Sequence, residues 1–347
     1  MSKNFWSNKR VLVTGHTGFK GGWLSLWLTS MGAKVYGYSL APEEKSFYHA
    51  THVDTVIAGE AFHNINNLSD LRSFFELAAP EIVFHLAAQS LVRPSYIDPI
   101  ETFSTNIMGT VNVLDCAFKS NAKAVINVTS DKCYENREVS HAYNENDPMG
   151  GHDPYSASKG CSELVTASYR RSFYNSTNKF LASARAGNVV GGGDWSTDRL
   201  VPDFLRAWDE KQTLMIRSPE AIRPWQHVLE PLSGYIALAE KLYCSGNEFA
   251  SGWNFGPSHH DTKTVKWVVE YLSLLAKGSS WAQSEGHNPH EAKLLSLDST
   301  KSQNHLQWKP RWNVETALKK TVEWHLEWKK SGEMKSYSLK QIGEYCG

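Results

Sequence analysis

Two short segments in the middle of the chain carry side chains that can move protons. In the first, Ser130, Asp131 and Lys132 place a hydroxyl, an acid and an amine at consecutive positions. In the second, Tyr155 stands one helical turn before Lys159, so both side chains share a face if the segment is a helix. A free tyrosine has a pKa near 10, and a neighbouring ammonium favours its ionised form. Together the segments predict redox chemistry coupled to proton transfers.

The composition excludes several classes of protein. Lys plus Arg and Asp plus Glu number 36 each in 347 residues, so the charge predicts neither nucleic acid nor a membrane surface as a partner. No apolar run approaches the roughly 20 residues of a spanning helix, and residues 1–6 lack the apolar core of a signal peptide. We expect a cytoplasmic protein with one large and one smaller domain.

The cysteines and histidines show no pattern of a metal or disulfide site. The 5 cysteines are odd in number and include no Cys-x-x-Cys pair, which argues against a disulfide framework and against structural zinc. His259-His260 and His287-x-x-His290 lack the supporting ligands of a metal centre. We therefore expect reduced thiols and no metal.

Apolar runs alternate with segments of helical length in the first half of the chain. The expected strands are 11–13, 35–38, 82–84, 124–128 and 180–184, and the expected helices are 23–28, 69–78, 97–119 and 155–174. The strands are apolar throughout, which is typical of a parallel sheet covered on both faces. The predicted fold class is α/β, a Rossmann-type doubly wound parallel sheet with a smaller C-terminal α/β substrate-binding cap.

The regular alternation fades after the glycine run 191–193. We expect helices near 199–210, 230–243, 264–276 and 314–330, and strands at 214–216 and 253–255. Residues 1–190 are accordingly expected to form the Rossmann-type domain. Residues 191–347 are expected to be mainly a substrate domain, interleaved with late strands of the main sheet.

A glycine-rich turn, Gly15-His16-Thr17-Gly18-Phe19-Lys20-Gly21, follows the first strand and opens a helix. This context predicts a dinucleotide site, because glycines let the backbone approach a pyrophosphate and the helix N-terminus faces its charge. Lys20 is unfavourable at a helix start unless an anion is near. Either a bound phosphate offsets this cost or the lysine points into solvent.

The second strand ends in Gly37-Tyr38-Ser39-Leu40 and offers neither an acid for the ribose of NAD nor a base for the phosphate of NADP. The absence of Arg favours NAD. The missing carboxylate predicts looser cofactor binding, since Glu43 and Glu44 belong to a solvated loop.

The chain resembles the extended short-chain dehydrogenase/reductase family over most of its length. Five motifs carry the resemblance in the family's order. They are Gly15-x-x-Gly18-x-x-Gly21, His85-Leu86-Ala87-Ala88-Gln89, Thr105-Asn106-Ile107-x-Gly109-Thr110, Tyr155-x-x-x-Lys159, and Arg223-Pro224-Trp225 with Val228.

The residues after Ser130 discriminate between members of this family. Epimerases of nucleotide sugars carry only Ser or Thr and small residues there, and dehydratases of dTDP-glucose and GDP-mannose carry an acidic pair. Asp131-Lys132, together with the 16–21 turn and Gly193-Asp194-Trp195, is similar to the members that dehydrate a CDP-linked hexose. The resemblance thus implies NAD as cofactor, CDP-glucose as partner and a role in deoxysugar synthesis for surface polysaccharide.

The resemblance also implies a role for each side chain. Tyr155, supported by Lys159, takes a proton as the sugar is oxidised at C4, and Ser130 binds the 4-oxygen. Asp131 then protonates the departing 6-hydroxyl while Lys132 removes the C5 proton, which requires a neutral acid beside a neutral amine. Hydride finally returns to C6. A solvated loop ion pair is the alternative interpretation of Asp131 and Lys132.

The remaining predicted site residues fall into two sets. The cofactor set comprises Gly15, Thr17, Gly18, Phe19, Lys20, Gly21, Ser39, Asn64, Ile65, Leu86, Ala87, Ala88, Gln89, Asn106, Thr129, Tyr155 and Lys159. The substrate set comprises Gln89, Ser130, Asn188, Arg199, Leu200, Arg217, Arg223, Trp225 and His227.

Several of these residues have a second interpretation. Asn106 either bends its helix around a water that relays protons to Lys159 or is a satisfied polar residue between helices. Leu86, Ala87 and Ala88 either admit a nicotinamide ribose or simply pack closely. For Trp225 and His227 the alternative to a place in the pocket is core packing.

Two other activities and an assembly remain open from the sequence. A 4-epimerase shares Tyr155 and Lys159 but has no need of Asp131 or Lys132, and a non-catalytic dinucleotide sensor could use the same fold. Helices 97–119 and 155–174 carry apolar residues on more than one face. They predict a four-helix bundle between two subunits, in a homodimer or homotetramer.

Overall fold

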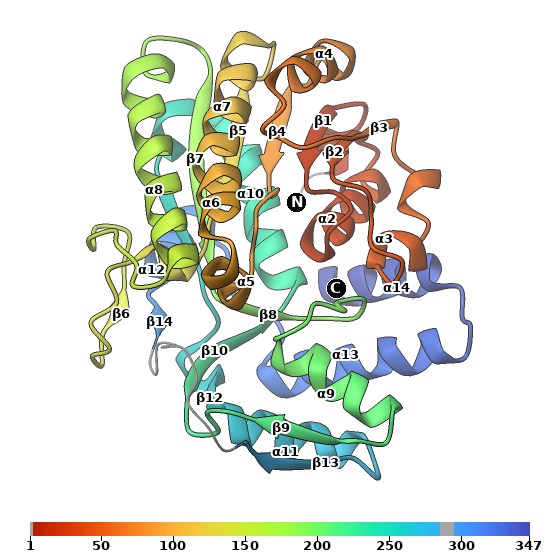
Figure 1. The fold of residues 1–347 in the computed structure, drawn as a ribbon. Coiled ribbons are helices and arrows are strands. Elements are labelled where there is room, and N and C mark those ends of the chain that lie inside the picture. Colours follow the sequence, from red (N-terminus) through yellow and green to blue (C-terminus); the bar gives the residue numbers. More distant parts are fainter. Residues whose placement is uncertain (1–2, 285–294) are drawn as a thin grey trace.

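The computed structural model describes residues 3–284 and 295–347, and its centre is a parallel sheet of seven strands (Figure 1). The strand order is β11-β7-β5-β4-β1-β2-β3. The strands are β1 (Arg10–Thr14), β2 (Lys34–Ser39), β3 (Gly59–Phe62), β4 (Ile82–His85), β5 (Ala124–Val128), β7 (Phe180–Ala186) and β11 (Gly252–Phe255). All six neighbouring pairs are parallel.

The central strands are largely apolar and buried because helices cover both faces of the sheet. Every residue of β4 and β5 is buried, and the register places Val13 opposite Phe84. This is the pattern expected of a doubly wound parallel sheet. The predicted fold class and the five strands predicted in the first half of the chain are confirmed.

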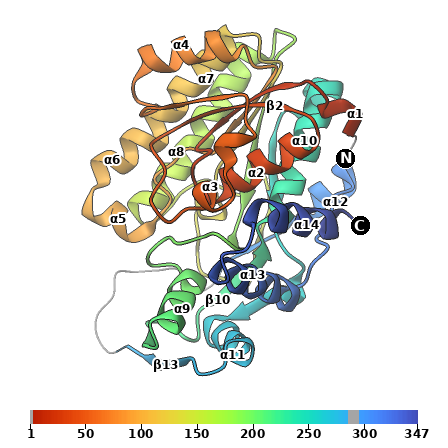
Figure 2. The same ribbon diagram turned by 90° about the vertical axis from the view of Figure 1, so that its right-hand side faces the viewer.

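The helices form two layers around the sheet (Figure 2). On one face, α2 (Phe19–Ser30) and α10 (Leu229–Ser245) share a core with the sheet in which Trp23 and Trp27 are fully buried. The other face is covered by α4 (Leu68–Ala78), α7 (Gly109–Lys119) and α8 (Pro154–Tyr169). Burial of these apolar faces is what holds the strand ends in place.

The single helix predicted at 97–119 is interrupted, and in this respect the prediction was wrong. Asp98 ends α5 (Val92–Ile97), and its side chain accepts a hydrogen bond of 2.9 Å from the backbone N–H of Glu101 to cap α6 (Pro99–Phe103). A π-helical turn (Ser104–Met108) then leads into α7. Such turns are rare within helices and are frequent at functional sites.

The helix predicted at 155–174 is present as α8 followed by a second π-helical turn, Arg170–Tyr174. Two further helices lie beyond the predicted elements. One is α12 (Thr300–Leu306), and the other is α14 (Met334–Cys346), which contacts α2 and α13. Short elements complete this part of the fold: α1 (Lys3–Trp6), α3 (Phe47–Ala50), β6 (Ala142–Tyr143) and β14 (Ser296–Leu297).

A smaller layer lies below the main sheet in Figure 1. It contains a three-stranded sheet, β12-β10-β8, and a two-stranded sheet, β13-β9. The elements of this cap are β8 (Asn188–Val190), β9 (Thr213–Ile216), β10 (Ile222–His227), β12 (Thr262–Thr264), β13 (Ser280–Gln283), α9 (Leu200–Asp209), α11 (Val265–Leu275) and α13 (Val314–Lys329). Strand β11 follows the first cap strands in sequence yet pairs with β7 in the main sheet, so the chain passes repeatedly between the two layers.

Candidate active site

The glycine-rich turn after β1 is shaped by two close backbone approaches. Gly15 has a φ of +76°, and a Cβ there would lie 2.8 Å from the backbone nitrogen of Ala87. A Cβ on Gly21 would lie 2.0 Å from the carbonyl oxygen of Gly15. Only glycine therefore fits either position. The turn opens α2, whose first N–H groups form a site suited to a phosphate.

Lys20 is directed toward the interior of the site. Burial lowers the pKa of its ammonium to about 8, Arg199 lowers it further, and the Asp131 carboxylate opposes this change. The residue is partly buried, and its ammonium is close enough to Arg199 and Asp131 for their charges to act on it. Phe19 lies beside it, with its ring close to Gly191 of the cap.

At the end of β2, where dinucleotide-binding domains commonly carry a carboxylate for the ribose, this chain has the hydroxyl of Ser39 beside that of Thr17. Thr17 Oγ1 lies 2.7 Å from Ser39 Oγ and 3.0 Å from the Leu40 carbonyl oxygen. The nearby carboxylate belongs to Glu60 on β3, and it binds His16 Nε2 at 2.9 Å and the Tyr48 hydroxyl at 2.7 Å. Glu43 and Glu44 are exposed, as expected.

The next loops along this edge of the sheet follow β3 and β4. The Asn64 side chain accepts a hydrogen bond of 2.8 Å from the backbone N–H of Asn66, and Ile65 is buried. After β4, the backbone N–H groups of Leu86 and Ala87 both donate to Thr14 Oγ1 at 3.2 Å. Ala88 follows directly and is partly buried. These loops therefore border the same strand ends as the glycine turn.

The catalytic turn, which we define as the 3₁₀ turn Asp131–Cys133, follows β5. Ser130 caps it by accepting a hydrogen bond of 3.3 Å from the backbone N–H of Lys132, and its hydroxyl lies 3.0 Å from Asp131 Oδ1. Asp131 is buried. Burial raises the pKa of this carboxyl, while Lys132, Ser130 and Arg223 oppose the rise. The acid is thus biased toward the protonated form that proton donation requires.

Helix α8 carries the second group of predicted catalytic side chains, Tyr155 and Lys159. Asp153 caps the helix by accepting a hydrogen bond of 2.9 Å from the backbone N–H of Ser156, and Pro154 occupies its first turn. Burial raises the pKa of Tyr155 to about 12, and a hydrogen bond with Ser130 acts in the opposite direction. Burial lowers the pKa of Lys159 to about 8, and its ammonium lies 3.4 Å from the Val128 carbonyl oxygen.

Asn106, in the first π-helical turn, joins the loop after β4 to α8. Its amide accepts from the backbone N–H of Gln89 and donates to the Gln89 carbonyl, both at 2.9 Å, and it also donates to Ser158 Oγ at 2.8 Å. The side chain of Gln89 bonds Leu91 and Thr102. Both amides therefore hold the loop in shape.

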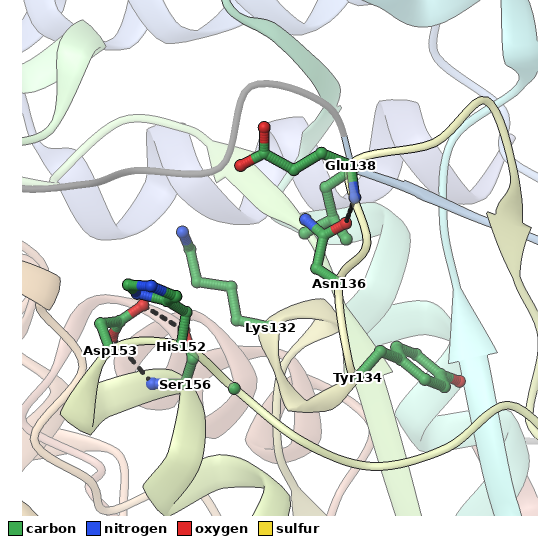
Figure 3. A pocket seen from close by; sticks show the side chains of 9 residues that line it. Lys132, Tyr134, Asn136, Glu138, His152, Asp153 and Ser156 are labelled. Carbon is green, nitrogen blue, oxygen red and sulfur yellow. Dashed lines mark hydrogen bonds between the residues drawn. The ribbon is translucent and has the colours of Figure 1, made fainter.

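A small cavity lies on the solvent side of the catalytic turn (Figure 3). Its lining includes Lys132, Asn136, Glu138, His152 and Asp153. In the view of Figure 3 the Lys132 side chain extends between His152 and Glu138. Among residues 3–284 and 295–347, no hydrogen-bond partner of the Lys132 ammonium is found.

The cap contributes a group of arginines near these side chains. Arg199 Nη1 lies 3.1 Å from the buried Asp194 carboxylate, and Nη2 lies 3.3 Å from Ser90 Oγ. Arg217 pairs with Asp198 at 3.5 Å, and so does Arg93 at 3.1 Å.

The other predicted substrate residues in the cap have different surroundings. Arg223 is buried, and its guanidinium acts on the pKa of Asp131. Asn188 pairs in register with Trp225 where β8 meets β10. Leu200 packs against the core of the cap.

Two predicted substrate residues, Trp225 and His227, lie among packed side chains. Trp225 is 5 % exposed, and its indole N–H donates to the Lys263 carbonyl at 3.1 Å within the core of the cap. His227 is fully buried, and its ring packs edge-on against those of Trp23 and Trp312. Burial lowers the pKa of His227 to about 3. Both side chains fit the alternative of core packing, and their place in the substrate set stays a prediction.

Some functional residues were missed from the sequence. Asp194, although part of the family resemblance, was not predicted to orient an arginine, and Arg93 was not predicted at all. Glu163 lies one helical turn beyond Lys159. Its carboxylate accepts a hydrogen bond of 2.5 Å from the hydroxyl of Thr129. The same spacing that linked Tyr155 to Lys159 could have found Glu163.

Other classes of site are absent from the described ranges. No group of His, Cys, Asp or Glu in residues 3–284 or 295–347 could hold a metal ion, and His287 and His290 lie outside those ranges. The five cysteines are free. No described helix is both long enough and apolar enough to cross a bilayer.

The arrangement can perform two linked reactions. A phenol, a hydroxyl and an ammonium stand beside a turn shaped for a dinucleotide, which suits hydride transfer from a carbinol. An acid of raised pKa and an amine stand next to them, which suits loss of a hydroxyl beside the new carbonyl.

The chain matches the model of a known protein family and is similar to several known proteins. The family is described as GDP-mannose 4,6 dehydratase, and the match spans residues 12–321. A CDP-glucose 4,6-dehydratase of Salmonella typhimurium is 51 % identical over 353 aligned residues, with 99 % of this chain and 98 % of that protein covered. A probable dTDP-glucose 4,6-dehydratase of Sinorhizobium fredii is 27 % identical, with 96 % and 98 % covered.

Solved structures share the fold. An epimerase of Methanothermobacter thermautotrophicus has a TM-score of 0.82 at 21 % identity and covers 94 % of this chain and 95 % of its own. A dTDP-glucose 4,6-dehydratase of Bacillus anthracis, solved in complex with NAD, has a TM-score of 0.76 at 20 % identity and covers 91 % and 96 %.

Proposed function

The chain belongs to the GDP-mannose 4,6-dehydratase family, and we propose that it is an NAD-dependent CDP-glucose 4,6-dehydratase. The reaction converts CDP-glucose to CDP-4-keto-6-deoxyglucose and water. The observation that carries the proposal is the position of Ser130, whose hydroxyl lies 3.0 Å from Oδ1 of the buried acid Asp131 and which also acts to lower the pKa of the Tyr155 phenol. One side chain thereby joins the groups for oxidation to the groups for loss of water.

The backbone of the glycine-rich turn after β1 leaves room for the pyrophosphate of a dinucleotide. The cradle after β1 exists because Gly15 and Gly21 have no Cβ, and the start of α2 faces it. NAD, when bound, accepts hydride from C4 of the sugar and returns it to C6. We propose that Thr17 and Ser39 serve the adenosine ribose in place of a carboxylate, and that the remaining predicted cofactor residues line the same cradle.

Oxidation at C4 needs a base for the 4-hydroxyl proton. Tyr155 takes this proton, and Ser130 holds the 4-oxygen. Burial works against the phenolate by raising its pKa to about 12, so the positive charge of Lys159 one turn away is required to favour the ionised form. The Lys159 pKa of about 8 leaves that ammonium charged at neutral pH.

Loss of water follows once the C4 ketone has made the C5 proton acidic. Lys132 removes that proton, and Asp131 donates its proton to the departing 6-hydroxyl, so that a C5–C6 double bond forms as water leaves. The raised pKa of buried Asp131 supports the role of acid. After hydride arrives at C6, a proton returns to C5 and the product is complete.

The sugar nucleotide is expected to lie between the two layers. The cationic groups of Arg199, Arg217 and Arg223 can bind phosphate oxygens bidentately, and Asn188 stands at the edge of the same strands. We propose that residues 1–190, completed by α10 and β11, bind NAD, and that residues 191–347 mainly bind the sugar nucleotide.

The exposed outer faces of two helical segments support a homodimer or homotetramer. Ile97 is 85 % exposed and Ile100 is 81 % exposed, and on α8 Leu164 is 60 % exposed. Met108 is also exposed. Such apolar residues gather on an interaction face, so we propose that the face formed by α5, α6, the π-helical turn Ser104–Met108 and α8 pairs with the same face of a second copy. The cytoplasmic location stays a prediction.

The deciding experiment compares sugar nucleotides side by side. Purified protein is incubated with NAD and CDP-, dTDP-, UDP- or GDP-glucose, and a 4-keto-6-deoxy product is measured. CDP-glucose is expected to react at least tenfold faster than the others. A product that keeps its 6-hydroxyl and differs only at C4 indicates a 4-epimerase, and retained dinucleotide without turnover indicates a sensor. Either result contradicts the proposal.

A further inference from the structure

A buried ion pair lies directly behind the catalytic groups. It joins Glu163 on α8 to Arg185 on β7, with Nε and Nη2 of the guanidinium 2.9 Å and 2.8 Å from the two carboxylate oxygens. Their side chains are 4 % and 6 % exposed. Burial alone would raise the pKa of Glu163, but Arg185 and the hydroxyls of Thr129 and Ser183 hold it below its usual range.

The ion pair holds both ends of the catalytic turn. On the N-terminal side, Thr129 Oγ1 donates to Glu163 Oε1 at 2.5 Å. On the C-terminal side, Arg185 Nη1 donates to the Tyr134 hydroxyl at 2.7 Å, and the guanidinium lies over the Tyr134 ring at 5.1 Å. Hydrogen bonds from a charged donor are stronger and more directional than neutral ones. The residues on both sides of the turn are therefore hydrogen-bonded to the same ion pair. We call these two contacts, Thr129 to Glu163 and Tyr134 to Arg185, the first and second tethers.

The second tether continues into the main sheet. The Tyr134 hydroxyl donates to Asn254 Oδ1 on β11 at 2.7 Å, and the amide of Asn254 donates to the carbonyls of Tyr143 and Asp298. Tyr134 and Lys132 leave the turn in opposite directions (Figure 3). The buried tyrosine thus fixes one side of the turn while Lys132 extends from the other.

We infer that Tyr134, with the Glu163–Arg185 ion pair, is a positioning residue for the loss of water. The inference rests on the proposed function. The tethers hold the segment that carries the acid and the C5 base, whereas Tyr155 stands on α8 and is oriented by the cap of that helix. Loosening the tether at Tyr134 displaces Asp131 and Lys132 and leaves hydride transfer in place. A misplacement of about 1 Å can cost roughly 100-fold in rate.

The test is Tyr134→Phe, which keeps the ring and the ion pair and removes both hydrogen bonds of the hydroxyl. Single turnovers with CDP-glucose are followed by absorbance of NADH, which forms as C4 is oxidised, and by formation of the 4-keto-6-deoxy product. NADH formation is expected to stay within about twofold of the parent rate, while loss of water slows at least tenfold, so that NADH accumulates.

The matched control is Tyr143→Phe. Tyr143 is also buried and stacks on Tyr134 with ring centroids 5.3 Å apart, but its hydroxyl bonds Asn136 and the backbone N–H of Arg137 instead of the ion pair. In Tyr143→Phe the ratio of the rate of NADH formation to the rate of loss of water is expected to equal the ratio in the parent protein. Equal slowing of both steps in Tyr134→Phe, or an unchanged ratio, overturns the inference.

A second measurement separates failure of this inference from failure of the proposed function. Amide hydrogen exchange without substrate is expected to rise at residues 131–134 in Tyr134→Phe and to stay unchanged at the start of α8. If the parent does not turn over CDP-glucose, the proposed function fails while exchange still decides the tethering, and equal protection in both proteins overturns it. Should Tyr134→Phe not fold, Asn254→Ser removes the acceptor of the Tyr134 hydroxyl, and the same ratio of the two rates is expected and decides the inference.

Discussion

The hydroxyl of Ser130 lies 3.0 Å from the carboxylate Oδ1 of Asp131, inside the segment that joins β5 to the catalytic turn. Ser130 also acts to lower the pKa of the Tyr155 phenol, against the larger effect of burial. The group proposed to hold the 4-oxygen therefore lies beside the proposed acid for the 6-hydroxyl and influences the proposed base for the 4-hydroxyl proton. Two reactions at neighbouring carbons can thus proceed without the sugar leaving the site.

Replacing the C5 base should separate the two reactions. Lys132→Ala is expected to oxidise C4, with NADH visible by absorbance, but to lose exchange of the C5 hydrogen with deuterated solvent. Lys277→Ala, which removes an exposed lysine of the cap, is the control and should behave as the parent. Unchanged C5 exchange in Lys132→Ala would remove that lysine from the role of base.

Replacing the acid should give the complementary defect. Asp131→Asn keeps the size of the side chain but cannot donate a carboxylic proton, so product formation should fall by roughly 100-fold or more. Exchange at C5 should persist, because the ketone and Lys132 remain. The measurement is deuterium incorporation at C5 beside product yield. Loss of water at the parent rate would show that another group is the acid.

The stability of the protein without ligands should depend on pH through Lys159. Its pKa is lowered from 10.5 to about 8 by burial, so between these values the unfolded chain binds a proton that the folded protein has released. Stability therefore rises with pH across this window and is lowest below it. Lys159→Met should abolish turnover and raise the free energy of unfolding at pH 7 by up to about 3 kcal/mol.

The effect is measured by denaturant unfolding of both proteins at pH 7 and at pH 10. The difference between them should shrink as the pH rises, because Lys159 is then neutral in the folded parent. A Lys159→Met protein that is less stable than the parent at pH 7 would show that the ammonium is not penalised by its surroundings.

Arg199 should contribute to binding of the sugar nucleotide. It bridges the two layers by bonding Asp194 of the cap and Ser90 after β4. Arg199→Ala should raise KM for CDP-glucose by about 10- to 100-fold, the effect of losing a hydrogen bond to a charged group. Affinity for NAD should change little. Arg206→Ala, which removes an arginine paired with Asp203 on α9, is the control, and equal KM values in the two variants would contradict the assignment.

The sequence was most informative where a residue's environment is set by the sheet. The apolar runs at β1, β4 and β5 predicted these strands, because both of their faces are covered. Strand β3 was not predicted, since Gly-Glu-Ala-Phe is a partly exposed edge strand without an apolar run. The interruption of 97–119 was also missed, because the π-helical turn at Asn106 depends on partners at Gln89 and Ser158 that are distant in sequence.

The candidate site shows the same division. Motifs of local spacing located Tyr155, Lys159 and the catalytic turn. Long-range pairs such as Glu163 with Arg185 could not be found from spacing, because they are brought together only when α8 packs on β7. For Trp225 and His227 the motif position left a place in the pocket and core packing both open, and the structure shows that both side chains are buried.

The transfer of the C4 hydrogen to C6 is the step that can be tested most directly. CDP-glucose carrying deuterium at C4 is incubated with the protein and NAD in ordinary water, and the product is examined by mass spectrometry and NMR. The account predicts that the deuterium appears in the new C6 methyl group within one turnover. Deuterium that is retained at C4 or released to the solvent would contradict it.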